Sequence, residues 1–117
     1  MLHFKDTKFS ELFCIYDVFS QACIEEVNTQ QYFRSFVFNI LGATIFFIRN
    51  SYESSSITNF LEGVSKYISY INEMEASTTH IVIDTYRRDL IVNFILSVGL
   101  ECGYELDEDY TLIFRKF

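Results

Sequence analysis

Five acidic residues gather near the C-terminus, where they lie within nine positions that no basic residue interrupts. They are Glu101, Glu105, Asp107, Glu108 and Asp109. Tyr104 and Tyr110 flank the acidic turn, and tyrosine is a favoured anchor residue at protein interfaces. The segment therefore predicts a partner-binding edge that could cover a cationic groove of another protein. The alternative is a charged hairpin tip that keeps the protein soluble and protects an edge strand from unwanted pairing.

Two adjacent arginines, Arg87 and Arg88, begin a predicted helix directly after a predicted strand. A helix N-terminus with two guanidinium groups can bind a phosphate or a carboxylate, because its free N–H groups and its dipole favour anions. However, no glycine-rich turn precedes the arginines, so the backbone cannot wrap a pyrophosphate. The sequence leaves two expectations open, an anion-binding pair or a surface salt bridge such as one to Asp89.

The histidines and cysteines offer little for catalysis or metal binding. His80 and Asp84 fall on one face of a predicted strand, but about 13 Å would separate them there, so they cannot form a hydrogen-bonded dyad. Cys14 and Cys23 lie on the apolar stripe of a predicted helix, which leaves Cys102 as the remaining thiol. Three scattered cysteines and two scattered histidines also lack the convergent spacing of a zinc site. We expect no metal, no cofactor and no enzymatic activity.

The charge balance narrows the class of partner. Sixteen acidic residues against nine basic ones give a formal net charge of −7. This charge opposes direct binding to nucleic acid, which relies on Lys and Arg, and binding to an anionic membrane surface. A basic protein is the partner that such a field would attract, although the charge can also serve solubility alone.

Length and composition predict one folded domain over residues 1–117, in a reducing cytoplasm. Half of the residues are apolar, and 13 Phe with 8 Tyr supply an aromatic core. Met1–Ser10 mixes lysine and aspartate with apolar residues, unlike a signal peptide, and no two cysteines have the CxxC spacing. The longest apolar run, Phe36–Ile48, is too short to cross a membrane.

Hydrophobic periodicity predicts three helices. Apolar residues recur at intervals of three and four over Phe9–Val27, Ile57–Met74 and Arg87–Val98. The serine cluster at 54–56 offers an N-cap to the second of these helices, and Gly99 is expected to end the third as a C′ glycine.

The segments between the predicted helices favour strands, because they are rich in Phe, Val and Ile. We expect Tyr32–Leu41 and Thr44–Asn50 to be two strands joined at Gly42 and Ala43, with a helical hairpin as the less favoured alternative. A covered central strand is expected at Thr79–Thr85.

Two further strands are expected around the acidic turn, at Cys102–Leu106 and Tyr110–Lys116. The resulting order is α-β-β-α-β-α-β-β. It predicts an α+β fold, in which a four- or five-stranded, largely antiparallel sheet packs against three helices.

The last third of the chain resembles part of the GNAT acetyltransferase family. The resemblance lies in the order of a strand, a helix, Val98-Gly99-Leu100 and a final hairpin. The glycine-containing loop with which that family holds the coenzyme pyrophosphate has no match here, so no functional residue is carried over.

A second resemblance is one of type. A small, acidic, aromatic-rich chain without a motif resembles the immunity proteins that neutralise bacterial toxins, including those of contact-dependent growth inhibition systems. Such proteins share no common motif. The resemblance implies tight, antitoxin-like binding to one toxin domain, often a nuclease.

The leading expectation is a non-enzymatic protein-binding inhibitor that blocks the active site of a basic toxin or nuclease domain. Its contact residues would be the acids and tyrosines of the 101–110 segment. Two alternatives stay open: a small acyltransferase-like or anion-ligand-binding domain that uses Arg87 and Arg88, and a structural subunit of a homo-oligomer. The sequence does not decide the oligomeric state.

Overall fold

The computed structural model describes residues 7–29, 34–76 and 85–106, which form four helices. The helices are α1 (Thr7–Thr29), α2 (Arg34–Glu53), α3 (Ile57–Ala76) and α4 (Thr85–Glu101). No strand occurs in these described ranges. The part of the chain that the structure describes is therefore all-helical.

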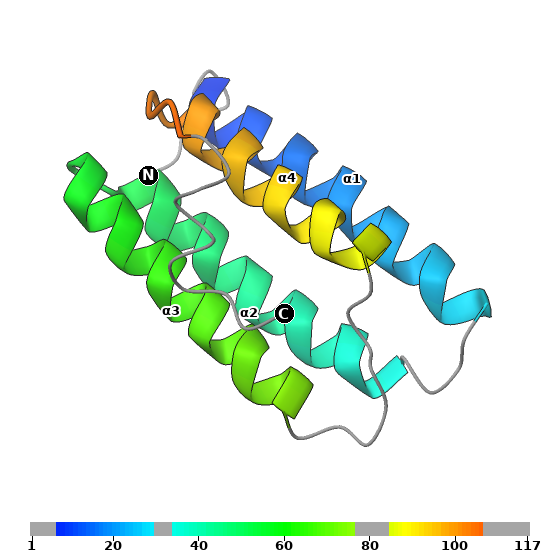
Figure 1. Cartoon of the computed structure of the whole chain (residues 1–117). Helices are drawn as coiled ribbons and strands as arrows, with labels where there is room; N and C mark the ends of the chain where they lie inside the picture. The colour runs from blue at the N-terminus through cyan, green and yellow to red at the C-terminus, as the bar shows by residue number, and fades with distance from the viewer. Residues whose placement is uncertain (1–6, 30–33, 77–84, 107–117) are drawn as a thin grey trace.

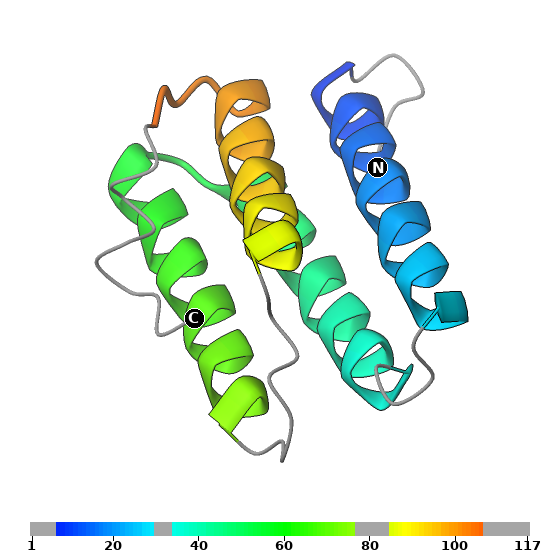
Figure 2. The ribbon, with the colours of Figure 1, turned by 45° about the vertical axis from the view of Figure 1, so that its right-hand side comes forward.

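Each helix runs antiparallel to the one before it, so the chain goes up, down, up and down along the molecule (Figure 1). α1 packs against both α2 and α4, and α2 packs against both α1 and α3. The pairs α1–α4 and α2–α3 form two layers that face each other (Figures 1 and 2). The shared core lies between these layers.

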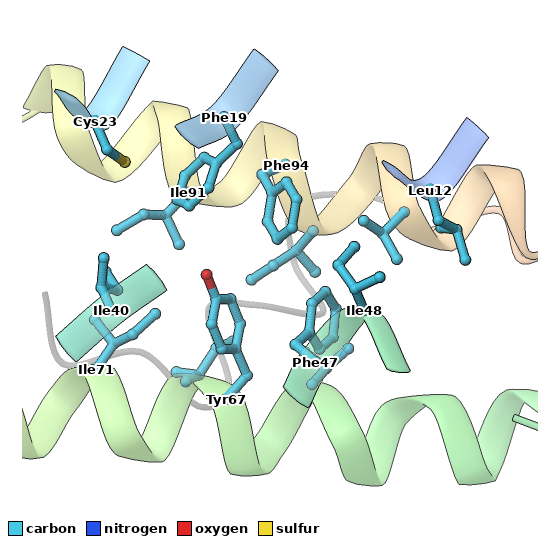
Figure 3. Close-up of a cluster of buried hydrophobic side chains, with 14 of the residues drawn as sticks. Leu12, Phe19, Cys23, Ile40, Phe47, Ile48, Tyr67, Ile71, Ile91 and Phe94 are labelled. Carbon is cyan, nitrogen blue, oxygen red and sulfur yellow. The ribbon is translucent and has the colours of Figure 1, made fainter. Parts of the chain in front are cut away.

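An aromatic cluster at the centre of the bundle joins all four helices (Figure 3). The ring of Phe47 on α2 stacks on that of Tyr67 on α3, with centroids 4.7 Å apart and an interplanar angle of 9°. Phe94 on α4 lies 5.8 Å from Phe47 and stacks on Phe19 of α1 at 4.4 Å. Such a pair contributes about 0.5–1.5 kcal/mol beyond the burial of its area. The other core positions surround this cluster: Leu12, Cys23, Val37, Ile40, Ile48, Phe60, Val64, Ile68, Ile71, Ile91, Ile95 and Val98.

A chain of two buried hydroxyl groups crosses this core. Thr44 Oγ1 donates to the carbonyl of Ile40 at 2.6 Å, so the hydroxyl of Tyr67, at 2.7 Å, must donate to Thr44. Burial raises the pKa of Tyr67 far above its usual value of 10.0. The contribution of the neutral Tyr67 hydroxyl to the free energy of unfolding is therefore fully present below pH 10.0. It is lost as the pH rises through the pKa of the folded state, because Tyr67 ionises at a lower pH in the unfolded chain.

Local hydrogen bonds define the ends of the helices. The predicted N-cap in the serine cluster is confirmed, because Ser56 Oγ accepts from the backbone N–H of Asn59 at 3.1 Å. α4 ends in a Schellman motif, in which the N–H of Tyr104 donates to the carbonyl of Gly99 at 2.8 Å. Gly103 occupies the turn with a φ of 90°, a conformation that glycine adopts without steric cost.

The prediction of an α+β fold with an antiparallel sheet is wrong. The strands expected at Tyr32–Leu41 and Thr44–Asn50 are replaced by α2, which runs unbroken from Arg34 to Glu53; residues 32 and 33 lie outside the described ranges. The free energy gained by burying one apolar side of the helix exceeds the intrinsic strand propensity of these β-branched and aromatic residues. The stripe recurs at intervals of three and four, as a helix requires: Val37, Ile40, Thr44, Phe47, Ile48 and Ser51.

The three predicted helices are confirmed as α1, α3 and α4. One predicted boundary is wrong, because Gly99 lies inside α4 and does not end it. There it lets the ring of Phe60 come close, since a Cβ on Gly99 would lie 3.3 Å from that ring. The glycine that ends the helix is Gly103.

The remaining predicted strands have different outcomes. The strand at Cys102–Leu106 is wrong, because residues 102 and 103 form a turn and 104–106 continue without regular structure. The strands expected at Thr79–Thr85 and Tyr110–Lys116 fall outside the described residues, except that Thr85 begins α4.

Gly103→Ala is expected to lower the free energy of unfolding by about 1–2 kcal/mol, because alanine resists a left-handed backbone conformation. Gly42, exposed in the middle of α2, has open space within 4 Å of an added Cβ and serves as the matched control. Gly42→Ala should raise the free energy of unfolding by about 0.5–1 kcal/mol, because alanine favours a helix interior. Urea unfolding in dilute solution, where contacts between copies of the chain contribute least, measures both. A loss of stability in both variants would contradict the backbone described for Gly42.

A double-mutant cycle tests the buried hydroxyl chain. Thr44→Val leaves the Tyr67 hydroxyl without its acceptor and should cost about 1–3 kcal/mol of unfolding free energy. Tyr67→Phe removes the donor and should cost about 1 kcal/mol. The double variant should lose less than the two single variants together, because it leaves no buried hydroxyl without an acceptor. Additive losses in urea unfolding would show that the two hydroxyls do not interact.

Candidate functional site

The acidic segment predicted as a partner-binding edge is described only in its first part. Glu101 ends α4 and is half-buried, while Glu105 is exposed. Asp107, Glu108, Asp109 and Tyr110 lie outside the described residues. The interface role of this segment therefore stays a prediction.

Tyr104, the tyrosine at the start of that segment, packs onto the end of the bundle. Its ring lies 5.1 Å from that of Phe60 on α3. Its hydroxyl lies 3.3 Å from Ser54 Oγ, in the connection between α2 and α3. These contacts cover the end of the core, so Tyr104 stabilises the fold of its own chain. A tyrosine that served only to bind a partner would not make them.

Arg87 and Arg88, the predicted anion-binding pair, have different surroundings. Arg87 is only 4% exposed, whereas Arg88 is half-exposed and its Nε lies 3.8 Å from the Asp89 carboxylate. The Arg88–Asp89 contact is the salt bridge that the sequence left open as the alternative. Successive helical residues point about 100° apart, so the two side chains leave α4 in different directions.

The three cysteines also have different surroundings. The prediction that Cys14 lies on the apolar stripe of its helix is wrong, because Cys14 is exposed. Cys23 is buried in the core as predicted, and Cys102 is half-buried. Cys102 Sγ donates to the carbonyl of Ser51 at 3.4 Å, and burial raises the pKa of this thiol. A protonated thiol is a poor nucleophile. Within the ranges 7–29, 34–76 and 85–106, no three His, Cys, Asp or Glu side chains gather as metal ligands.

The outer face of α2 is the surface least expected from the sequence. We define it by the exposed residues that the structure describes on this helix: Arg34, Phe38, Asn39, Gly42, Ile45, Phe46, Arg49, Asn50 and Glu53. No charged residue lies between Arg34 and Arg49. Phe38, Ile45 and Phe46 are 68%, 57% and 66% exposed. A helix that is apolar toward both the core and the solvent is normally covered on both sides.

A groove lies beside this face, between α2 and α3. Its volume is about 510 Å³, and the buried rings of Phe47 and Tyr67 are part of its lining. Phe38 and Phe46 from α2 and Tyr70 from α3 add exposed rings. The small lining residues are Gly42, Ala43 and Gly63. The groove therefore combines aromatic walls with places where no side chain fills the space.

The composition of residues 36–48 explains why this surface was missed. Abundant Phe and Ile favoured two strands, although the buried residues of this segment recur at the spacing of a helix. The signal that could have found the surface is the long gap in charge between Arg34 and Arg49. No helix in the described part of the chain has the length and apolar character to cross a membrane.

Comparisons with known proteins assign no family to this geometry. The scan against protein-family models gives no match, and the searches of curated proteins and of solved structures find no significant similarity.

The two sides of α2 should respond differently to substitution. Phe38→Gln and Phe46→Gln replace exposed rings and should change the unfolding free energy by no more than about 0.5 kcal/mol. Phe47→Ala removes a buried ring and should cost about 3–5 kcal/mol. Urea unfolding in dilute solution, where self-association contributes least, makes the comparison. A large loss in the Phe46 variant would mean that this ring serves the fold.

Proposed function

We propose that this chain is a non-enzymatic protein-binding domain and that the outer face of α2 is its main contact surface. The observation that carries the proposal is the exposure of Phe38, Ile45 and Phe46 on an uncharged stretch of helix. Aromatic residues are enriched and charged residues depleted at the centre of protein interfaces. Leaving three such side chains in water has no benefit for the fold, so a partner that covers them explains their presence.

The form of the groove supports a protein partner over a small molecule. Phe38 and Phe46 are each about two-thirds exposed, so their rings point largely into solvent. A small-molecule site buries most of its ligand among convergent groups. An open groove between two helices suits an amphipathic helix, whose apolar side chains can enter the open space at Gly42.

The surroundings of the reactive groups support a role without catalysis. The raised pKa of Cys102 keeps its thiol protonated, and Cys23 is enclosed by the core. Arg88 lies beside Asp89, away from Arg87. These arrangements favour neither a thiolate nucleophile nor a guanidinium pair around an anion, so the acyltransferase-like alternative has no specific support.

Inhibition of a basic toxin or nuclease domain, as an immunity protein would do, stays a prediction. The net charge of −7 supports a basic partner. Most of the described acids lie on α1 and α3, whereas the outer face of α2 carries Glu53 as its acid beside two arginines. A basic partner would therefore approach faces other than that of α2.

Site-specific photocrosslinking tests the contact surface. Benzoylphenylalanine at position 38 or 46 should form protein adducts in the cells that produce the chain, because these positions lie where the partner binds. The same probe at exposed Asp17 on α1 or Asp89 on α4 is the control. Denaturing gels and mass spectrometry read out the adducts. No adduct from positions 38 and 46, or equal yields from all four positions, would contradict the proposal.

A further inference from the structure

We propose that a second copy of this chain covers the outer face of α2, with the two α2 helices packed antiparallel. The two-fold axis would pass level with the midpoint between residues 43 and 44, the centre of the helix. The inference rests on the proposed function, because it names the partner of the same surface. The spacing, the charges and the shape of this face each support it.

The spacing of the exposed stripe is the same in both directions. From Arg34, the stripe advances by four, four, three, four and four residues, through Phe38, Gly42, Ile45 and Arg49 to Glu53. At about 100° per residue these positions span roughly 100° of the helix circumference, so they lie on one side. A symmetric spacing means that an antiparallel copy places every position of the stripe opposite another one.

The charges at the two ends of the stripe are complementary in this register. Arg34 of one copy lies opposite Glu53 of the other, so the two-fold symmetry gives the dimer two such ion pairs. Arg49 lies opposite Phe38, where a guanidinium group can stack on the exposed ring. Among the described residues, Arg34 and Glu53 have no ion-pair partner within their own chain.

The helix dipole gives a second reason for the antiparallel direction. Arg34 is the first residue of α2 and Glu53 the last, so each charge opposes the dipole of its own helix; the first turn has no acid and the last turn no base. In the antiparallel pair, Arg34 lies beside the C-terminal end of the other helix, and Glu53 lies beside its N-terminal end. The dipole of the second copy's α2 therefore stabilises both charges.

The shape of the face fits a close approach at its centre. Gly42 lies opposite Ile45 of the second copy, and an added Cβ on Gly42 would have nothing within 4 Å. The two-fold axis also places the side of α2 that lies next to α3 against the same side of α2 in the second copy. Phe46 of one copy therefore reaches the groove of the other at the level of Gly42 and Ala43.

The distribution of charge favours this face over those of α1 and α3. Two chains of net charge −7 repel each other, so association is favoured through the least acidic surface. Exposed acids lie on α1, at Glu11, Asp17 and Glu25, and on α3, at Glu62 and Glu73. A dimer through either helix would bring like charges together.

A charge-swap experiment on the full chain tests this register. Sedimentation equilibrium should show a wild-type dimer at micromolar concentration. Arg34→Glu or Glu53→Arg alone places like charges opposite each other twice and should raise Kd roughly tenfold or more. The double variant R34E/E53R restores opposite charges and should return Kd to near the wild-type value. The matched controls on α4, Arg88→Glu and Asp89→Arg, change the same charges away from the face and should leave Kd nearly unchanged.

Two results would overturn the proposal: a wild-type chain that stays monomeric up to about 1 mM, or a double variant as weak as the single ones. A circular-dichroism melt of each variant separates lost pairing from lost folding. If the chain is monomeric but positions 38 and 46 crosslink to a different protein, the dimer fails and the protein-binding function stands. A crosslinked product with twice the 13.8 kDa mass of the chain supports both.

Discussion

The stack of Phe47 on Tyr67 is the contact on which the rest of the structure depends. It joins α2 to α3, and Phe94 extends it to α4 and, through Phe19, to α1. The hydrogen bond between Thr44 and Tyr67, one helical turn from Phe47, fixes the position of the tyrosine within this cluster. Because Thr44 and Phe47 must both face inward, the segment from Arg34 to Glu53 has to be a helix, since a strand would turn them to opposite sides.

The same constraint creates the exposed surface. Once α2 is fixed with one apolar side in the core, its other apolar side has to face outward. No charge interrupts that side between Arg34 and Arg49, and α1 and α3 leave Phe38 and Phe46 uncovered. One sequence segment therefore serves two purposes: its inner side holds the bundle together, and its outer side exposes apolar and aromatic side chains with charged residues at both ends.

The sequence predicted α1, α3 and α4 because apolar residues recur in each at intervals of three and four. It did not predict α2, because the abundance of Phe, Val and Ile favoured strands although the buried residues of this segment have the same helical spacing. Two of the predicted strands are replaced by α2, and a third is replaced by the turn at Gly103 and the residues after it. The role of Tyr104 could not be predicted either, because Phe60 and Ser54 become its neighbours only after the helices pack.

The proposed dimer places the outer face of α2 of one copy against the same face of the other. Isotope-filtered NMR on a mixture of labelled and unlabelled protein at about millimolar concentration detects contacts between the two copies. A dimer packed in this way should give intermolecular cross-peaks from the Phe38 ring to the Arg49 side chain and from Gly42 to the methyl groups of Ile45. The absence of such cross-peaks, or cross-peaks that instead arise from exposed residues of α1 and α4 such as Val18 and Leu100, would contradict it.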